Sequence, residues 1–200
     1  MESYDLQSVA ELLAGEYVVN SNRSVCVIVK LELYQCKKEN NIMFRTIRKK
    51  KNEISIDTAK ALLQSSRRGV LAVNGDDGYP YAIPINYVYD DDAQKIYFHG
   101  ARAGHKVDAL RACDKVCFTV YGNETIKEED WAPFVQSVVV FGRCHLVESG
   151  ARATTLLKRF AMKYYPSEQL VDEEIAHAGK AVQIFEIDVE YLSGKEIQER

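Results

Sequence analysis

Large and small side chains alternate with unusual regularity between Tyr79 and Tyr89. The odd positions carry large side chains, whereas the even positions are small or, at Pro80 and Pro84, lack a backbone donor. A period of two predicts a strand with two different faces, and the prolines place it at a sheet edge or at a bulge. The small face leaves room for a flat ligand or for close packing against a neighbouring strand, and the pattern leaves both interpretations open.

Five further strands are predicted, and the last of them alternates cleanly: Val70 to Asn74, Lys95 to His99, Lys115 to Tyr121, Phe134 to Val147 and Gln183 to Tyr191. Asp76-Asp77-Gly78 is a hairpin signal, Asn123 to Ala132 is typical of an acidic loop, and Gly142 marks a bulge. Hairpin turns without a regular alternation of strands and helices indicate a mostly antiparallel barrel of about six strands with helices packed outside.

Helical spacing marks the segments between these strands. Ser55 is placed to cap a helix that carries Ile56, Ala59 and Leu63 on one face. Further helices are predicted from His105 to Ala112, through an amphipathic stretch from Ala153 to Tyr164, and from Asp172 to Ala178.

The segment from Lys95 to Ala112 joins a strand, a glycine-rich turn from Gly100 to Gly104, and a helix start at His105-Lys106. A helix start presents unpaired N–H groups and a positive dipole end, and Lys106 adds a full charge. The segment is therefore either a phosphate site for a nucleotide-like cofactor or an ordinary corner with a solvated lysine. It fits neither the Walker pattern nor a full Rossmann fingerprint.

Composition and charge limit the classes of binding partner that we expect. The 200-residue chain is 46% hydrophobic and 28% charged, with a net charge of −3, so nothing favours general nucleic-acid binding. We interpret the basic run from Arg48 to Lys51 as a solvated segment start. The most apolar window, Val25 to Leu33, is interrupted by Lys30 and Glu32 and is too short to span a bilayer, so no membrane association is predicted.

The five cysteines form no CxxC pair, and the acidic start lacks the features of a signal peptide, which indicates a cytoplasmic protein. Cys113, Cys117, Cys144 and His145 could be drawn as a metal site. Their spacing fixes no geometry, and small buried cysteines are common, so no metal is predicted.

Residues 1–42 differ from the rest and are predicted to be an N-terminal extension to a domain that covers residues 43–200. They end in the polar run Lys37 to Asn41, and codons for Lys-Lys-Glu can form a ribosome-binding site just upstream of Met43. Either Met43 is the biological start, or the extension is a real N-terminal arm. Mass spectrometry of the native N-terminus separates these alternatives.

Four segments, in this order and at this spacing, resemble the FMN-binding split-barrel superfamily: Gly69 to Val73, Gly78 to Tyr89, Lys95 to Lys106 and Val116 to Val120. Within it they are most similar to the pyridoxamine 5′-phosphate oxidase-related branch that includes the 5-nitroimidazole resistance (Nim-type) proteins. Met43-Phe-Arg and Leu192 to Glu196 also look typical of this branch.

The resemblance implies a mainly β protein with flanking helices, in which a six-stranded antiparallel split barrel dimerises and holds FMN, with FAD as the other candidate, at the subunit interface. By position, His105 and Lys106 resemble the phosphate-contacting pair, with Arg68 as a helper. The remaining positions that match the flavin site are Pro84, Ile85, Asn86 and Tyr87 along the ring, His99, Gly100, Ala101 and Gly104 around the ribityl and turn, and Ser137 and Val138 from the partner subunit.

The resemblance implies reduction of a small molecule, with NAD(P)H as a candidate electron donor. The most specific form of this prediction is a nitroaromatic substrate. His99 is the candidate catalytic residue, or else a strand histidine hydrogen-bonded within the barrel. The chain lacks the C-terminal Trp- and Arg-containing motif with which true pyridoxamine phosphate oxidases bind substrate, which speaks against vitamin B6 oxidation. Two rivals remain: a flavin-binding module or electron carrier without a substrate, and a haem-binding barrel with His99 as a ligand.

Overall fold

A computed structural model describes residues 44–127 and 132–198 of the chain. The predicted extension, the candidate start at Met43 and the single tryptophan, Trp131, lie outside the described residues. The described part begins with a 3₁₀ turn, η2 (Lys50–Asn52), followed by α3 (Ile56–Ser65). Ser55 caps α3 as predicted, because its Oγ accepts a hydrogen bond of 3.1 Å from the Thr58 N–H.

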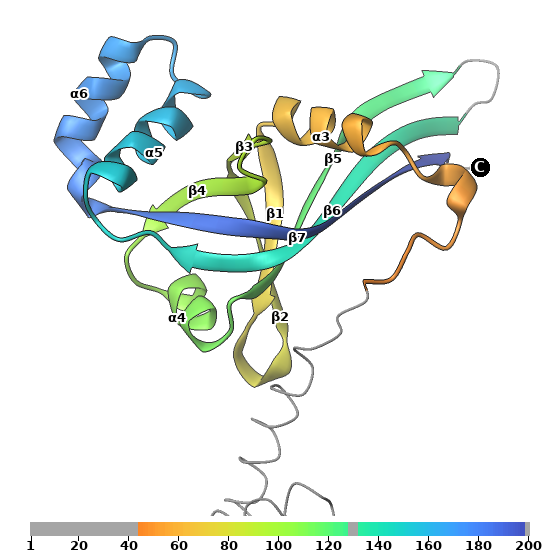
Figure 1. Cartoon of the computed structure of the whole chain (residues 1–200), viewed down its shortest axis with the longest axis horizontal. Helices are drawn as coiled ribbons and strands as arrows, with labels where there is room; N and C mark the ends of the chain where they lie inside the picture. Colours follow the sequence, from red (N-terminus) through yellow and green to blue (C-terminus); the bar gives the residue numbers. More distant parts are fainter. Residues whose placement is uncertain (1–43, 128–131, 199–200) are drawn as a thin grey trace, which may run out of the picture. The chain divides into compact units, whose positions relative to one another are not determined.

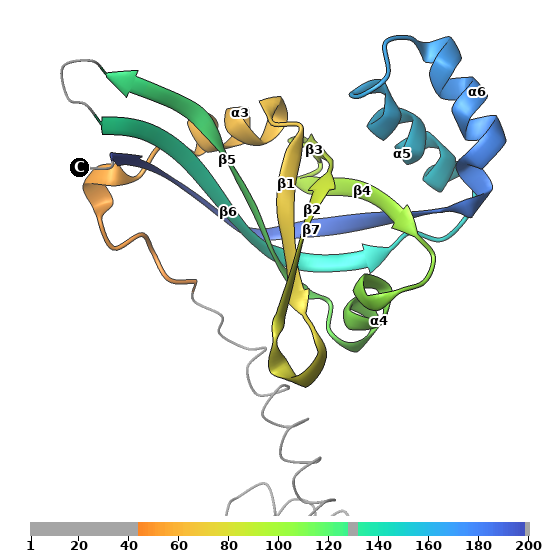
Figure 2. The ribbon, with the colours of Figure 1, turned by 180° about the vertical axis from the view of Figure 1, so that it is seen from behind.

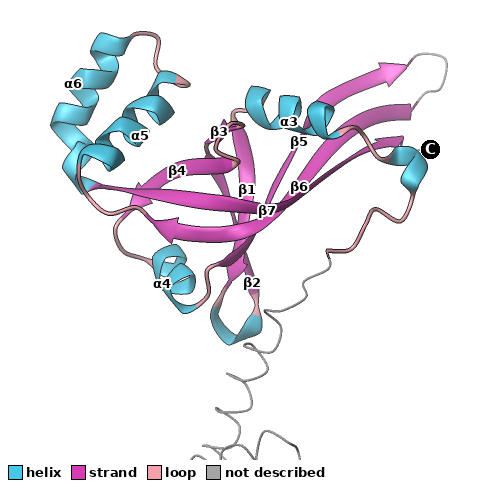
Figure 3. Cartoon of the chain, viewed as in Figure 1, coloured by secondary structure: helices cyan, strands magenta, loops and turns pink. Residues whose placement is uncertain are grey.

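The described strands form one antiparallel sheet in the hydrogen-bonded order β2-β1-β5-β6-β7-β4-β3 (Figures 1 and 3). They are β1 (Arg68–Asn74), β2 (Pro80–Asn86), β3 (Val88–Asp90), β4 (Lys95–Ala101), β5 (Lys115–Lys127), β6 (Ala132–Leu146) and β7 (Val182–Gln198). A 3₁₀ turn, η3 (Asp76–Gly78), connects β1 to β2 at the predicted hairpin.

The described sheet has seven strands, and the prediction of six was wrong by one. The predicted strand from Tyr79 to Tyr89 is divided at Tyr87 into β2, which pairs with β1, and β3, which pairs with β4. The cause is local, because the Tyr87 N–H donates to the Tyr164 hydroxyl and joins no ladder. The sheet is therefore not closed by hydrogen bonds, and the chain itself joins its two ends at Tyr87.

Two other strands run further than their patterns indicated. β5 continues to Lys127, so the predicted acidic loop begins later than Asn123. β7 continues to Gln198 and pairs with β6 along most of its length. The predicted bulge in β6 is confirmed by a register shift between Phe141 and Gly142.

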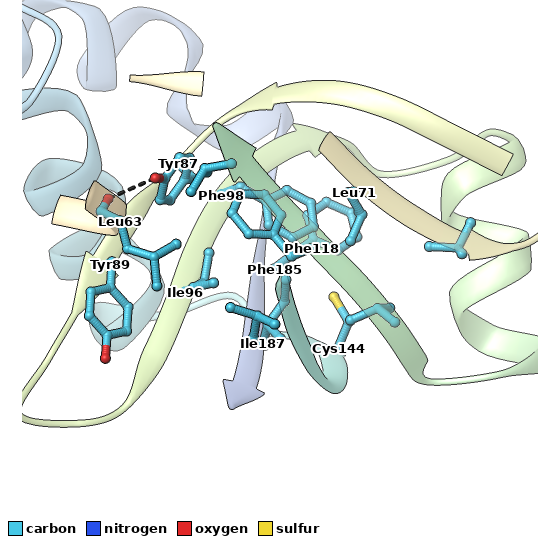
Figure 4. Packing of buried hydrophobic residues seen from close by; sticks show 14 of the residues in the cluster. Leu63, Leu71, Tyr87, Tyr89, Ile96, Phe98, Phe118, Cys144, Phe185 and Ile187 are labelled. Carbon is cyan, nitrogen blue, oxygen red and sulfur yellow. Dashed lines mark hydrogen bonds between the residues drawn. The ribbon is translucent and has the colours of Figure 1, made fainter. Parts of the chain in front are cut away.

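The core fills the space inside the curled sheet (Figure 4). Its fully buried members include Leu71, Phe98, Phe118, Phe185 and Ile187. The Phe98 and Phe185 rings stack with centroids 4.8 Å apart. Aromatic contacts of this kind add to the hydrophobic stabilisation of burial. Phe98 and Phe185 stand opposite each other in the pairing of β4 with β7.

Three more helices flank the sheet: α4 (His105–Ala112), α5 (Ala151–Met162) and α6 (Glu168–Ala178), with η4 (Gly179–Ala181) leading into β7. Helices α5 and α6 form a hairpin beside β4 and β7, whereas α3 lies across β5 and β6 at the other end (Figures 1 and 2). None of the helices in the described ranges is long and apolar enough to cross a membrane.

Ion pairs attach α5 to the sheet. Arg159 donates to Asp90, Arg152 donates to the buried Glu186, and Lys95 lies 2.6 Å from Glu186. Buried carboxylates require such partners, since an unpaired charge in the interior is costly. The position of α5 is thereby fixed against β3, β4 and β7.

One of these pairs predicts a dependence of stability on pH. The hydrogen bond from Arg159 holds the pKa of Asp90 below its ordinary value. Because the folded pKa is the lower one, the contribution is present above about pH 4 and is lost as the pH falls through the folded pKa. The urea midpoint of unfolding should therefore decrease more between pH 7 and pH 3 in the wild type than in Arg159→Gln. Parallel changes in the two proteins would contradict the coupling.

Candidate functional site

The first group of predicted site residues lies on the hairpin of β1 and β2. Arg68 stands opposite Asn86 in the register, and Val70 stands opposite Pro84. Pro84 and Asn86 are exposed, whereas Ile85 is half-buried. The small face of the alternating strand is therefore its outward face. Since β2 is also the first strand in the hydrogen-bonded order, its outer edge presents backbone groups that the described sheet does not use.

The second group lies on β4 and the start of α4. His99 and Ala101 are exposed on the outward side of β4, whereas Gly100 is half-buried on the inward side. Gly104 has a φ of 115° and begins α4 without a side-chain cap. That backbone conformation favours glycine, which explains why a glycine stands immediately before the helix.

His105 and Lys106, the predicted phosphate pair, make different contacts at the start of α4. The His105 ring stacks on Tyr81 at 4.1 Å, and its Nε2 lies 3.5 Å from Oδ2 of Asp76. The Lys106 Nζ instead lies 4.9 Å from the centre of the Phe185 ring. Successive residues on a helix point about 100° apart, so the two side chains leave α4 in different directions.

Lys106 extends across the inward face of β4 to the rings of Phe98 and Phe185 because residue 100 is a glycine. A Cβ at Gly100 would lie 2.5 Å from the Lys106 Nζ. The ammonium also lies 5.4 Å from the centre of the Phe98 ring, and it forms no ion pair within the described ranges. Burial lowers the pKa of Lys106 and raises the pKa of the adjacent Cys144 thiol to about 12. The site thus combines a half-buried cation with aromatic faces and a neutral thiol.

His99 lies on the opposite side of β4 from Lys106. Its ring meets the Phe160 ring edge-on, with centroids 4.6 Å apart and an interplanar angle of 81°. Burial, and then the positive charge of Lys106, lower the pKa of His99. The imidazole is therefore neutral at pH 7 and offers one N–H donor and one nitrogen acceptor.

The sequence patterns missed Tyr164, which follows the end of α5. Its hydroxyl accepts a 2.8 Å hydrogen bond from the Tyr87 N–H and lies 2.7 Å from the Tyr87 carbonyl and 2.6 Å from the Arg67 carbonyl. The Tyr87 side chain points into the core, where its hydroxyl donates to the Leu63 carbonyl (Figure 4). The spacing of Phe160 and Tyr164, four residues apart on a predicted helix, was the available signal.

Positive charge gathers beside Tyr87. The Lys163 Nζ donates 2.6 Å to the Ser66 carbonyl, and Arg67 lies 5.2 Å from the centre of the Tyr164 ring. Burial, and then the charge of Arg67, lower the pKa of Lys163 to about 8. The charges of Arg67 and Arg68 also act on the Tyr164 hydroxyl, so all four residues share one region. Such a region attracts anions.

Ser137 and Val138 occupy β6 and face opposite ways. Ser137 is half-buried and stands opposite Tyr121, whereas the Val138 side chain is fully buried in the core. Only the backbone of Val138 can therefore contact a ligand outside the barrel. Among the described residues, no three histidine, cysteine or acidic side chains gather as a metal site.

The Tyr164 hydroxyl provides a test of the join at Tyr87. In Tyr164→Phe the Tyr87 N–H loses its partner, and an unsatisfied buried donor costs about 1 to 3 kcal/mol. We expect that loss in the free energy of unfolding, measured with urea. Tyr165→Phe is the matched control, because Tyr165 is 40% exposed one position later. Equal stability of both variants would contradict the role of Tyr164.

Comparison with known proteins identifies the fold. The sequence profile described as "Pyridoxamine 5'-phosphate oxidase" matches residues 55–196. The chain belongs to the pyridoxamine 5′-phosphate oxidase family. This match confirms the resemblance that the four segments indicated. The matched range includes every predicted site residue of this chain. No curated protein matches the sequence.

Solved structures share the fold of this family member. A candidate 5-nitroimidazole antibiotic resistance protein from Bacteroides thetaiotaomicron is 17% identical, with 73% of this chain and 87% of that chain covered and a TM-score of 0.61. A flavocytochrome from Azotobacter vinelandii is 21% identical, with 76% and 72% covered and a TM-score of 0.62. A FAD-binding protein from Mesorhizobium loti is 22% identical, with 72% and 96% covered and a TM-score of 0.53.

Proposed function

We propose that this protein is a cytoplasmic, homodimeric FMN-binding oxidoreductase that reduces a small molecule. The family match over residues 55–196 is the observation that carries the proposal. Two of the similar structures bear names that include flavin, as a FAD-binding protein and a flavocytochrome. The three described cysteines are free thiols, which is compatible with a reducing compartment.

The residues present fit a flavin in most respects. The outward face of β2 is small and exposed, and its open edge offers backbone donors and acceptors to a planar ring. Arg67, Arg68 and Lys163 provide positive charge for a phosphate, and Lys106 provides a further cation. One donor does not fit, because the Tyr87 N–H is already bonded to Tyr164.

Bound flavin would supply the redox chemistry, and the chain would supply position and electrostatics. In this proposal Lys106 binds the phosphate, and Ile85 and Asn86 orient the ring through their backbone. His99 stays neutral and can donate or accept a proton at an imidazole nitrogen near the substrate. The Phe160 ring contacts the imidazole edge-on and helps to orient it.

The dimer would use the outward faces of β5 and β6. Tyr121 is 73% exposed and Ile126 72% exposed on β5, and Phe141 is 38% exposed on β6. Exposed apolar residues on neighbouring strands mark an association surface. A second copy that covers this face would bring Ser137 towards the flavin of its partner. Light scattering of the purified protein tests this arrangement, and a monomer at micromolar concentration would contradict it.

The purified protein should be yellow, with a flavin spectrum, and mass spectrometry of the released ligand should identify FMN or FAD. Bleaching by NAD(P)H, followed by reoxidation with a nitroimidazole, would support the nitroaromatic reductase over an electron carrier. A colourless protein that cannot be reconstituted with FMN would contradict the proposal.

Haem binding is the second candidate. The neutral imidazole of His99 can bind iron, and one similar structure is named a flavocytochrome. A Soret band that is present in the wild type and absent in His99→Ala would favour haem binding over the flavin enzyme.

A further inference from the structure

The basic run at Arg48 to Lys51, which the sequence explains as a solvated start, borders a groove of about 640 Å³. The groove lies between this run and the ends of β6 and β7, with Phe134 and Glu196 on the strand side. It shares no residue with the candidate flavin site. Its volume is within the range of small-molecule sites in proteins.

The wall formed by the basic run is fixed to the sheet. The Ile54 N–H donates a 3.0 Å hydrogen bond to the Gly194 carbonyl, and Glu53 forms an isolated β-bridge with Lys195. Gly194 permits this approach, because a Cβ there would lie 2.7 Å from the Ile54 side chain. The lysines on this wall are therefore held at the groove by backbone contacts.

The charges at the groove leave two lysines without partners. Glu53 is paired with Lys50 at 2.8 Å, whereas Glu196 keeps its negative charge and accepts a 3.0 Å hydrogen bond from the neutral Gln136 amide. Lys49 and Lys51 both line the groove, and neither forms an ion pair or a side-chain hydrogen bond in the described part of the chain. Among the described residues, two lysines without partners therefore face one carboxylate without a cationic partner, and the net charge facing the groove is positive.

We propose that this groove binds a nucleotide. Lys49 and Lys51 hold its phosphates, the Asn52 amide donates to them, and a planar base lies against Phe134 and Ile54. Two separated cations beside an aromatic and an aliphatic side chain fit a ligand that is anionic at one end and flat at the other.

The nucleotide that suits the chemistry is the reductant, a nicotinamide dinucleotide, and this identity rests on the proposed function. The two lysines favour the form with the additional phosphate, so NADPH is the probe. NADPH binding is measured on the full chain by its fluorescence, which requires no flavin reduction. Failure of the groove and failure of the flavin proposal are therefore distinguishable.

The test compares Lys49→Gln/Lys51→Gln with Arg48→Gln. The double variant should bind NADPH at least tenfold more weakly, because both phosphate partners are lost. Arg48→Gln changes the same run but is not among the residues that line the groove, and its affinity should stay within twofold of the wild type. NADH should bind more weakly than NADPH in the wild type and equally in the double variant.

Unchanged NADPH affinity in the double variant would overturn the site. Inorganic pyrophosphate that displaces NADPH with equal affinity would overturn the nucleotide assignment, because it carries no base. Weaker NADPH binding in the double variant would uphold the groove even if the protein held no flavin.

Discussion

Replacing Gly142 by alanine is expected to cost about 3 kcal/mol of folding free energy, at the upper end of what overpacking costs. A Cβ at residue 142 would lie 2.2 Å from the Asp188 carbonyl oxygen and 2.9 Å from a methyl group of Ile187. The first of these is main chain, which cannot move without disturbing the pairing of β6 with β7. Gly142 lies at the bulge where this pairing shifts register, so the added methyl group would strain the long pairing of β6 with β7.

Thermal unfolding measures this loss, which corresponds to roughly 6 to 12 °C for a chain of this size. Gly122→Ala is the control, since residue 122 also precedes an irregularity, in the pairing of β5 with β6. Its Cβ would meet only the end of the Leu62 side chain, at 3.2 Å. A Gly142→Ala protein as stable as Gly122→Ala would show that the bulge can relax.

Replacing Lys106 by alanine is expected to weaken FMN binding by roughly 1.5 to 3 kcal/mol, about 10- to 150-fold, if one charge-assisted hydrogen bond to phosphate is lost. The ammonium lies at the start of α4 without an ion-pair partner in the described residues, so its charge remains to be balanced by an anion. Titration of flavin fluorescence with the flavin-free protein measures the change.

Lys106→Met separates the charge from the packing. Methionine retains an unbranched stem against Phe98 and Phe185 but removes the ammonium. Both variants should bind FMN equally weakly. Wild-type affinity in both would place the phosphate elsewhere, for which Arg67 and Arg68 are the next residues to replace. Weak binding in Lys106→Ala alone would mean that Lys106 acts by filling space.

The sequence predicts local structure well where one interaction decides it. Ser55 caps α3 because the hydroxyl and the Thr58 N–H are three residues apart, which a sequence pattern records. The bulge at Gly142 is likewise a property of one residue in its strand. The face of α3 was harder, since Ile56 is 51% exposed and Leu62 is buried in its place. Which side a short helix buries depends on the sheet beneath it.

The site shows the same limit. Sequence position shows that His105 and Lys106 are neighbours, but it does not show that His105 stacks on Tyr81 while Lys106 lies over the Phe185 ring. The break at Tyr87 depends on Tyr164, which is 77 residues away and carries no motif. The alternation of Tyr79 to Tyr89 continues through the break and contains no sign of it. Contacts between distant elements leave no periodic trace in either partner.

The join at Tyr87 also sets the order in which the protein can be completed during its synthesis. The hairpin of β1 and β2 needs only residues 68–86, so it can form while the chain is still short. Its connection to β3 gains its hydrogen-bond partner only when Tyr164 has been made, and β4, which pairs with β3 on one side, gains its second neighbour only with β7. A nascent chain that stops before these residues exposes an unpaired strand edge, which is a template for aggregation. Such distant pairings also make folding slow. The protein therefore depends on its last third, which leaves the ribosome late, to cover the strand edges that the earlier strands leave unpaired.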